Sequence, residues 1–214
     1  MNFPRRLLFR TTVTCPKVDD IEIGTEPSEF DGIEPLPPLG TLEGQEPFAD
    51  VKIAYNESGL YVALFVERED AISVSRQRPH SADSLQVWLD TRGGVAGHRA
   101  TRFCHQFVCL GKGGGPQREE PVAWEEQIRR GARQSSLAQP GDIPLISRDT
   151  DTDYSLQVHF PADILRGFEP EPGENMRFNV LVTDYVHGRQ NYCCAGEFPY
   201  TYDPSTWAGL VLGD

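Results

Sequence analysis

Residues 84–90 alternate strictly between polar and aliphatic side chains, and no other segment of this chain constrains its fold as strongly. Successive side chains of a β-strand point to opposite faces, so the aliphatic set that begins at Leu85 can enter a core. The opposite face presents Gln86, Trp88 and Asp90, an amide, an indole and an acid, which suit stacking and hydrogen bonding to a polar ligand. The segment predicts an all-β binding module and carries no sign of catalytic machinery.

Two further segments have the pattern of β-hairpins. Residues 49–55 and 60–67 alternate on either side of a turn that contains Gly59, and residues 144–148 and 154–160 flank an aspartate-rich turn. Residues 119–139 suit either a helix or a strand, and Pro161 opens one expected helical turn. Other expected strands cover residues 6–15, 102–110, 176–185, 191–198 and 207–212. We expect an antiparallel, jelly-roll-like β-sandwich with one or two short helical turns.

The length of 214 residues suits one β-sandwich, and 20 glycines and 17 prolines are typical of a fold rich in loops. No repeat or change of composition divides the chain, so we predict a single domain over residues 1–214. Residues 1–44 form an N-terminal strand and an irregular wrap, and residues 45–212 form the core.

The net charge of −12 argues against a nucleic-acid partner and against docking on anionic lipid. The run of apolar residues near the N-terminus is too short for a signal peptide, and no segment is long enough for a membrane span. We therefore expect a soluble, cytoplasmic protein.

The five cysteines have no spacing typical of a disulfide framework, so we expect reduced thiols. His98, Cys104 and His105 are of metal-binding types, but adjacent residues of a strand point apart, so we expect no metal site there. A structural calcium at the aspartates stays open, although they lack the glycine and distal glutamate of a calcium loop. The aspartates concerned are Asp149, Asp151, Asp153 and Asp163.

Catalytic signatures are also missing from the sequence. Asp83 and Asp90 bracket one strand and would lie roughly 23 Å apart, too far for a pair of glycosidase carboxylates. No nucleophile elbow is present. We predict that the chain is not an enzyme.

Several short motifs follow one another in a recognisable order. They are the turn residues Tyr55, Gly59, Leu60, Tyr61 and Val62, the Asp-x-Leu-x-Val-x-Leu-Asp of 83–90, Phe103 and Phe107, residues 153–158 with Pro161 and Ala162, residues 176–180 with Asp184, and residues 203–210. In this order they resemble the family 9 carbohydrate-binding modules and their DOMON-like relatives, over roughly residues 45–212. The resemblance implies a β-sandwich that binds a saccharide without catalysis.

In sugar-binding members of that family, two tryptophans clamp the sugar with help from an acid, an arginine and an amide. The resemblance places the first clamp position at His80, the acid at Gln86, the arginine at Cys104 and the amide at Gln106. The second clamp position falls on Thr201, between Tyr200 and Tyr202, and only the amide is kept.

Two functions therefore stay open. The first is saccharide binding on a concave face by His80, Gln86, Trp88, Gln106, Tyr200 and Tyr202, and it predicts that Trp88→Ala abolishes binding while the fold stays intact. The alternative is a structural or protein-interaction sandwich that has lost the clamp.

Overall fold

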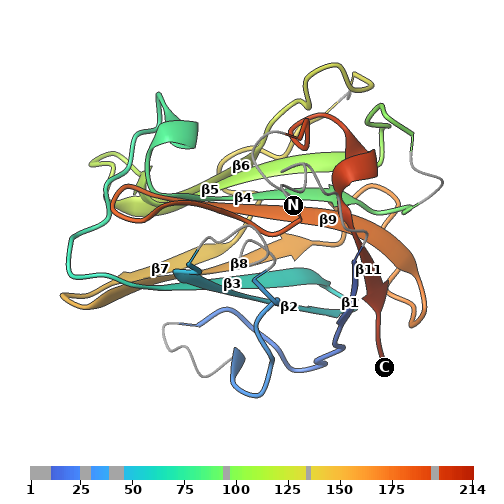
Figure 1. Ribbon diagram of the computed structural model, residues 1–214, viewed down its shortest axis with the longest axis horizontal. Helices are drawn as coiled ribbons and strands as arrows, with labels where there is room; N and C mark the ends of the chain where they lie inside the picture. The colour runs from blue at the N-terminus through green and yellow to red at the C-terminus, as the bar shows by residue number, and fades with distance from the viewer. Residues whose placement is uncertain (1–10, 25–29, 39–45, 94–96, 134–135, 194–197) are drawn as a thin grey trace, which may run out of the picture.

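The chain forms two β-sheets packed face to face (Figure 1). One sheet has seven strands in the order β1-β11-β9-β4-β5-β6, with β10 paired to β9, and the other has four in the order β2-β3-β8-β7. This arrangement confirms the predicted β-sandwich. The computed structural model describes residues 11–24, 30–38, 46–93, 97–133, 136–193 and 198–214.

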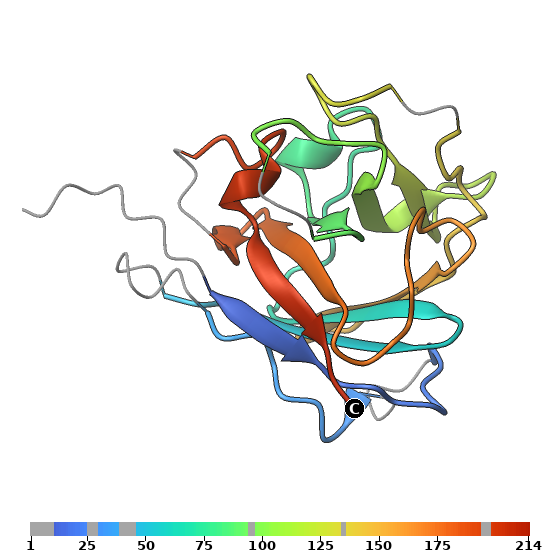
Figure 2. The same cartoon turned by 90° about the vertical axis from the view of Figure 1, so that its right-hand side faces the viewer.

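The seven-stranded sheet is antiparallel except at one edge, where β1 runs parallel to β11 (Figure 2). Two 3-10 turns, η3 (Pro79–Ser81) and η4 (Pro204–Thr206), lie on its outer side (Figure 1). Its strands are β1 (Thr12–Cys15), β4 (Ser84–Asp90), β5 (Cys104–Gly114), β6 (Glu120–Glu125), β9 (Asn175–Asp184), β10 (Gly188–Asn191) and β11 (Ala208–Leu212).

The four-stranded sheet is built from the two predicted hairpins. In the first, Asn56 pairs with Gly59 across the turn. Gly59 has φ +147°, and a Cβ there would lie 2.1 Å from the carbonyl oxygen of Phe160, so only glycine fits. The strands are β2 (Ala49–Asn56), β3 (Gly59–Glu67), β7 (Leu145–Asp149) and β8 (Asp153–Pro161).

The main core lies between the two sheets. Leu85, Val87 and Leu89 of β4 are all buried there, as their alternation predicted. Phe107 of β5 meets Phe160 of β8 across the interface, with ring centroids 4.5 Å apart. Each such side chain contributes about 1.5–3 kcal/mol when fully buried.

Residues 120–125, for which helix and strand were both open, form a strand, because Val108 of β5 pairs with Trp124 and extends the sheet. Several predicted boundaries are wrong. β5 continues through the glycine-rich segment to Gly114, and Pro161 ends β8 and leads into a turn. Of the strand expected over residues 191–198, only Asn191 belongs to a strand, β10 (Gly188–Asn191), and residues 194–197 lie outside the described part of the chain. Residues 6–10 of the first predicted strand lie outside the described part of the chain.

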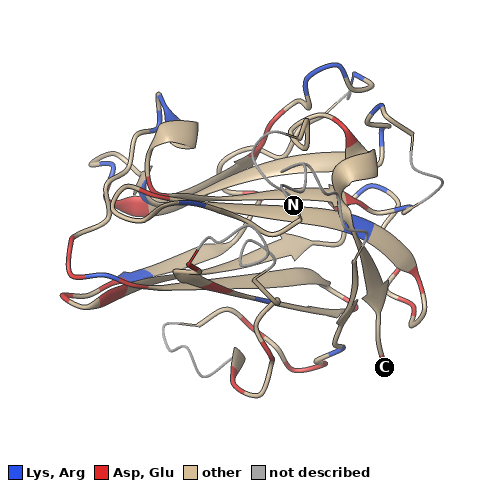
Figure 3. Ribbon diagram, in the orientation of Figure 1, with Lys and Arg blue, Asp and Glu red and all other residues tan. Residues whose placement is uncertain are grey.

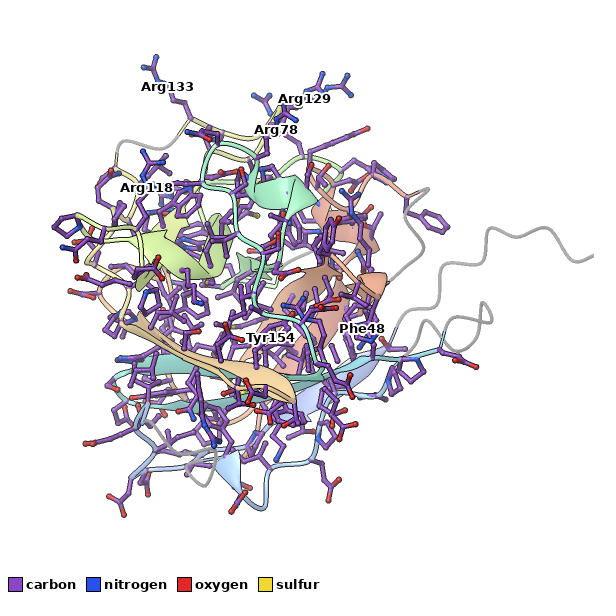
Figure 4. The ribbon with its side chains drawn as sticks, turned by 90° about the vertical axis from the view of Figure 1, so that its left-hand side faces the viewer. Phe48, Arg78, Arg118, Arg129, Arg133 and Tyr154 are labelled. Atoms are coloured by element: carbon purple, nitrogen blue, oxygen red, sulfur yellow. The ribbon has the colours of Figure 1, made fainter. Side chains whose placement is uncertain are left out.

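A buried ionic cluster links the two sheets near one end. The Arg68 Nη1 atom lies 2.8 Å from Asp83 Oδ2 and 2.7 Å from Asp184 Oδ2, and all three side chains are almost fully buried. Tyr154, which Figure 4 shows between the layers, donates its hydroxyl to Asp184. Burial acts to raise the pKa of Asp184, but hydrogen bonds from His187 and the charge of Arg68 outweigh it and hold that pKa below its usual value.

Four cysteines, Cys15, Cys104, Cys109 and Cys193, are buried, whereas Cys194 lies outside the described residues. Burial raises the pKa of Cys104 to about 11, so its thiol is protonated at neutral pH. In the described part of the chain, no helix has the length and apolar composition needed to cross a bilayer.

Candidate functional site

The outer face of the seven-stranded sheet is covered by loops and holds the residues that the sequence indicated. Trp88 of β4 has Gln106 of β5 and Asn179 of β9 as its cross-strand neighbours, so all three lie on this face. Trp88, Ala100, Cys104, Ile128, Leu181, Tyr200 and Trp207 form a second small apolar cluster there. The site therefore consists of polar groups above and around an apolar floor.

His80 and Gln86, two of the predicted binding residues, are in contact. η3 holds His80 over β4, and its Nδ1 atom lies 2.9 Å from Gln86 Oε1. Its Nε2 atom lies 3.3 Å from Glu126 Oε2, and 48% of the side chain is exposed. Both ring nitrogens face acceptor oxygens, which suits the doubly protonated imidazolium.

Glu126 is the centre of this polar group, although the sequence did not single it out. Its carboxylate accepts hydrogen bonds from Trp124 Nε1 at 3.1 Å and from Gln106 Nε2 at 3.4 Å, besides its contact with His80. Its side chain is 29% exposed. The alternation of Trp124 and Glu126 along a strand could have placed both side chains on this face. The sequence suits a helix as well as a strand there, so this alternation did not identify Glu126.

The charges of His80 and Glu126 stabilise each other. The hydrogen bond to Glu126 raises the pKa of His80 above its ordinary value. The same bond lowers the pKa of Glu126, against the opposing effect of burial. The face thus presents a half-exposed ion pair, and its oxygen and nitrogen atoms are suited to sugar hydroxyls.

The position of Trp88 requires a correction. Its indole is fully buried and meets the Tyr200 ring edge-on, with centroids 5.4 Å apart. The indole therefore offers no surface on which a ligand can stack, and it supports Tyr200 from below. The Tyr200 side chain is also buried, and its carbonyl accepts a hydrogen bond from Trp207 Nε1.

Of the predicted aromatic residues, Tyr202 lies nearest the surface. Tyr202 is half-buried beside the apolar cluster, and the Arg130 guanidinium lies 5.0 Å from its ring centroid. Cys104 is fully buried, accepts a hydrogen bond from the Thr101 amide, and is out of reach of a ligand. Thr201 is exposed. Gln86 and Gln106 are buried, so they orient His80 and Glu126 and make up the layer beneath them.

Several buried polar atoms on this face have no hydrogen-bond partner among the described residues. They include Gln86 Nε2, Trp88 Nε1 and Asn179 Nδ2. Buried donors are nearly always satisfied in folded proteins, by protein, water or ligand. Gln86 and Trp88 lie on the same strand, and Asn179 lies opposite Trp88 on β9, so these three donors are close to one another on the outer face.

His98, Asp203 and Ser205 resemble a catalytic triad but do not form one. Asp203 Oδ2 and Ser205 Oγ lie 3.0 and 3.1 Å from the same nitrogen, His98 Nδ1. A triad needs the acid and the serine on opposite ring nitrogens. The contacts of His98 with Asp203 and Ser205 instead hold the segment 97–100 against η4.

Two of the aspartates considered for calcium, Asp149 and Asp153, have other partners. Asp149 Oδ2 lies 3.0 Å from Lys112 Nζ, and Asp153 Oδ2 accepts the Thr152 hydroxyl. Within the described ranges, no group of three or more histidine, cysteine, aspartate or glutamate side chains is arranged to hold a metal ion.

A cavity of about 860 Å³ lies beside this face, at the rim where β2 and β3 approach β10. Phe48, labelled in Figure 4, stacks on His187 at 5.2 Å in its wall, and three carboxylates also line it. Arg189 links the cavity to the outer face of the sheet, because it lines the cavity and donates a hydrogen bond to the His80 carbonyl at 2.7 Å.

Comparison with known proteins supports the fold. No family model and no curated protein sequence matches the chain. Among solved structures, a family 9 carbohydrate-binding module from Caldicellulosiruptor kristjanssonii in complex with glucose superimposes with a TM-score of 0.64 and 14% identity, covering 95% of this chain and 97% of the module. Its complex with cellotriose also gives a TM-score of 0.64 at 14% identity, over 95% of this chain and 94% of the module.

A protein from Bacteroides uniformis, described as carbohydrate-binding, gives a TM-score of 0.63 at 14% identity, over 94% of this chain and 99% of its own. The fold is therefore that of the family 9 modules, as the sequence motifs predicted. At this identity the likeness concerns the fold, and the ligand must be argued from the site.

Proposed function

We propose that this chain is a non-catalytic module that binds a saccharide on the outer face of its seven-stranded sheet. The observation that carries the proposal is the half-exposed His80–Glu126 pair, backed by Gln86 and Gln106, on a face that also carries Tyr202 against its apolar cluster. It lies on the residues where the resemblance to family 9 modules places the sugar clamp. Two solved structures of similar fold contain glucose and cellotriose, which supports the same class of ligand here.

The chemistry of this face suits a sugar. Sugar rings combine apolar C–H faces with hydroxyls. Their binding sites pack an aromatic ring against the C–H face and direct a few polar groups to the hydroxyls. Tyr202 supplies the ring, while His80 and Glu126 supply a donor and an acceptor. The unpartnered Nε2 of Gln86 is a further donor next to His80.

The proposal is tested by isothermal titration of saccharides found on a glycan array. Tyr202→Ala and His80→Ala should each weaken binding at least tenfold, about 1.4 kcal/mol. Tyr185→Ala is the matched control, because this tyrosine is 75% exposed on the β9–β10 turn. Unchanged affinity in both site variants, or an equal loss in the control, would exclude this face as the binding site.

The exposed side chains of Tyr185 and Val186 favour a second candidate function, protein interaction at the β9–β10 turn. In that case no saccharide would bind, and Tyr185→Ala would release a partner. The array and the control variant separate these two functions.

A further inference from the structure

Basic residues are concentrated in three connections of this acidic chain. Residues 71–82, 91–103 and 127–141 contain eight arginines and no aspartate or glutamate. The whole chain has a net charge of −12, so removing those eight positive charges leaves −20 for the rest. In Figure 3 blue segments gather above the seven-stranded sheet, while red segments predominate below the four-stranded sheet.

The three connections surround the proposed saccharide site. The first carries His80, whose ring contacts Glu126, the residue immediately before the third connection. The second and third are joined by hydrogen bonds from the Arg99 Nε atom to the Arg130 carbonyl and from the Ala132 amide to the Ala100 carbonyl. The arginines therefore form a basic rim around one surface and are not scattered over the molecule.

Most guanidinium groups of this rim are available to a ligand. Among the described residues Arg92 pairs with Glu169 at 2.7 Å and the other seven take part in no ion pair, whereas arginines with a structural role, such as Arg68 and Arg166, have carboxylate partners. Figure 4 shows Arg78, Arg129 and Arg133 extending outward at the same end of the molecule, away from the four-stranded sheet. All eight arginines are exposed, and those without an ion-pair partner among the described residues are Arg76, Arg78, Arg99, Arg102, Arg129, Arg130 and Arg133.

Two arginines connect the rim directly to the proposed binding groups. Arg130 adopts φ +62°, which non-glycine residues rarely do, and its guanidinium lies 5.0 Å from the Tyr202 ring centroid. Arg189 of β10 donates to the carbonyl of His80. Positive charge thus lies against both the aromatic and the imidazole of the site.

We infer that the ligand of this face is an anionic saccharide, one that carries a carboxylate or a sulfate group. This inference rests on the proposed function and narrows it to a substrate class. The planar guanidinium donates two parallel hydrogen bonds to a carboxylate or sulfate, and unpaired arginines at a surface are suited to such groups. A nucleic acid is a poorer fit, because a long polyanion would also meet the excess negative charge on the rest of the molecule.

The test compares ligands that differ in charge alone. Binding of an oligogalacturonate and of its fully methyl-esterified form is measured by isothermal titration in 50 and 500 mM NaCl, beside a sulfated heparin-derived oligosaccharide. The acidic form should bind at least tenfold more tightly than the ester at low salt, and high salt should remove most of that difference. Whichever acidic ligand binds more tightly assigns carboxylate or sulfate as the recognised group.

Charge-reversal substitutions test whether the arginines of the rim bind the acidic group of the ligand. Arg78→Glu and Arg129→Glu should each weaken binding of the acidic ligand at least tenfold and leave binding of the ester within twofold. Arg148→Glu is the control, because Arg148 is exposed on β7 of the other sheet and the substitution changes the charge equally. An equal loss in the control would overturn the role of the rim.

The outcomes separate this inference from the proposed function. Equal, salt-independent binding of neutral and acidic saccharides would overturn the inference and leave the saccharide module standing. If no saccharide of either charge binds, the proposed function fails as well. Binding of a single-stranded DNA oligonucleotide in preference to every saccharide would replace the anionic saccharide with a nucleic acid.

Discussion

Replacing Arg68 by methionine should destabilise the protein strongly, because this guanidinium compensates two buried carboxylates. Arg68→Met leaves Asp83 and Asp184 with their side chains at most 1% exposed and without their cation. Removing one partner of a buried ionic group typically costs about 3–5 kcal/mol. For a domain of this size, that loss corresponds to a fall in Tm of roughly 6–20 °C.

The assay is urea unfolding followed by tryptophan fluorescence, with Arg148→Met as the exposed control. The control should change the free energy of unfolding by less than about 0.5 kcal/mol. A triple variant, Arg68→Met with Asp83→Asn and Asp184→Asn, should recover part of the loss, because it removes the uncompensated charges. A loss below about 1 kcal/mol in Arg68→Met would refute the reasoning.

The cluster also predicts the direction of a pH effect. The folded-state pKa of Asp184 lies below its unfolded value of about 3.9. Its contribution is therefore present above about pH 3.9 and is lost as the pH falls through the lower folded pKa. Part of the stability difference between the protein and Arg68→Met should disappear in the same acidic range.

Three further predictions follow from single contacts. Trp88→Ala should cost about 3–5 kcal/mol in urea unfolding, since the indole is fully buried, and a loss below about 1 kcal/mol would contradict that burial. His80→Ala should lower the free energy of unfolding by at most about 1 kcal/mol, and this loss should be largest between about pH 4.3 and 6.5, where both His80 and Glu126 are charged. The loss should shrink above the raised pKa of His80, and a larger loss at pH 9 than at pH 5.5 would be inconsistent with the ion pair. Gly59→Ala should lower Tm by the equivalent of about 1–3 kcal/mol, while Gly97→Ala, whose added methyl meets nothing nearer than 3.9 Å, should leave Tm nearly unchanged.

Most of the fold followed from alternation along the strands. Leu85, Val87 and Leu89 are buried in the main core because period-two patterning places them on one face, and the two hairpins formed where turn residues interrupted such patterns. The edge pairing of β1 with β11 was not predictable, because a parallel contact between the two ends of a chain leaves no local signal.

The candidate site could be predicted only in part. The resemblance brought His80 and Gln86 together, and they are in contact. It could not show that loops cover the outer face, so Trp88 was expected at the surface and is buried. Glu126 was missed because its segment suits two periodicities, and only its pairing beside β5 decides between them.

The most direct test of the proposed function is a chemical-shift map of the ¹⁵N-labelled protein titrated with the saccharide that the glycan array identifies. The account predicts that the largest changes fall on amides near His80, Gln106, Glu126 and Tyr202 on the outer face. Changes centred on the cavity at Phe48 and His187 would contradict it, and so would the absence of saturable changes with every saccharide.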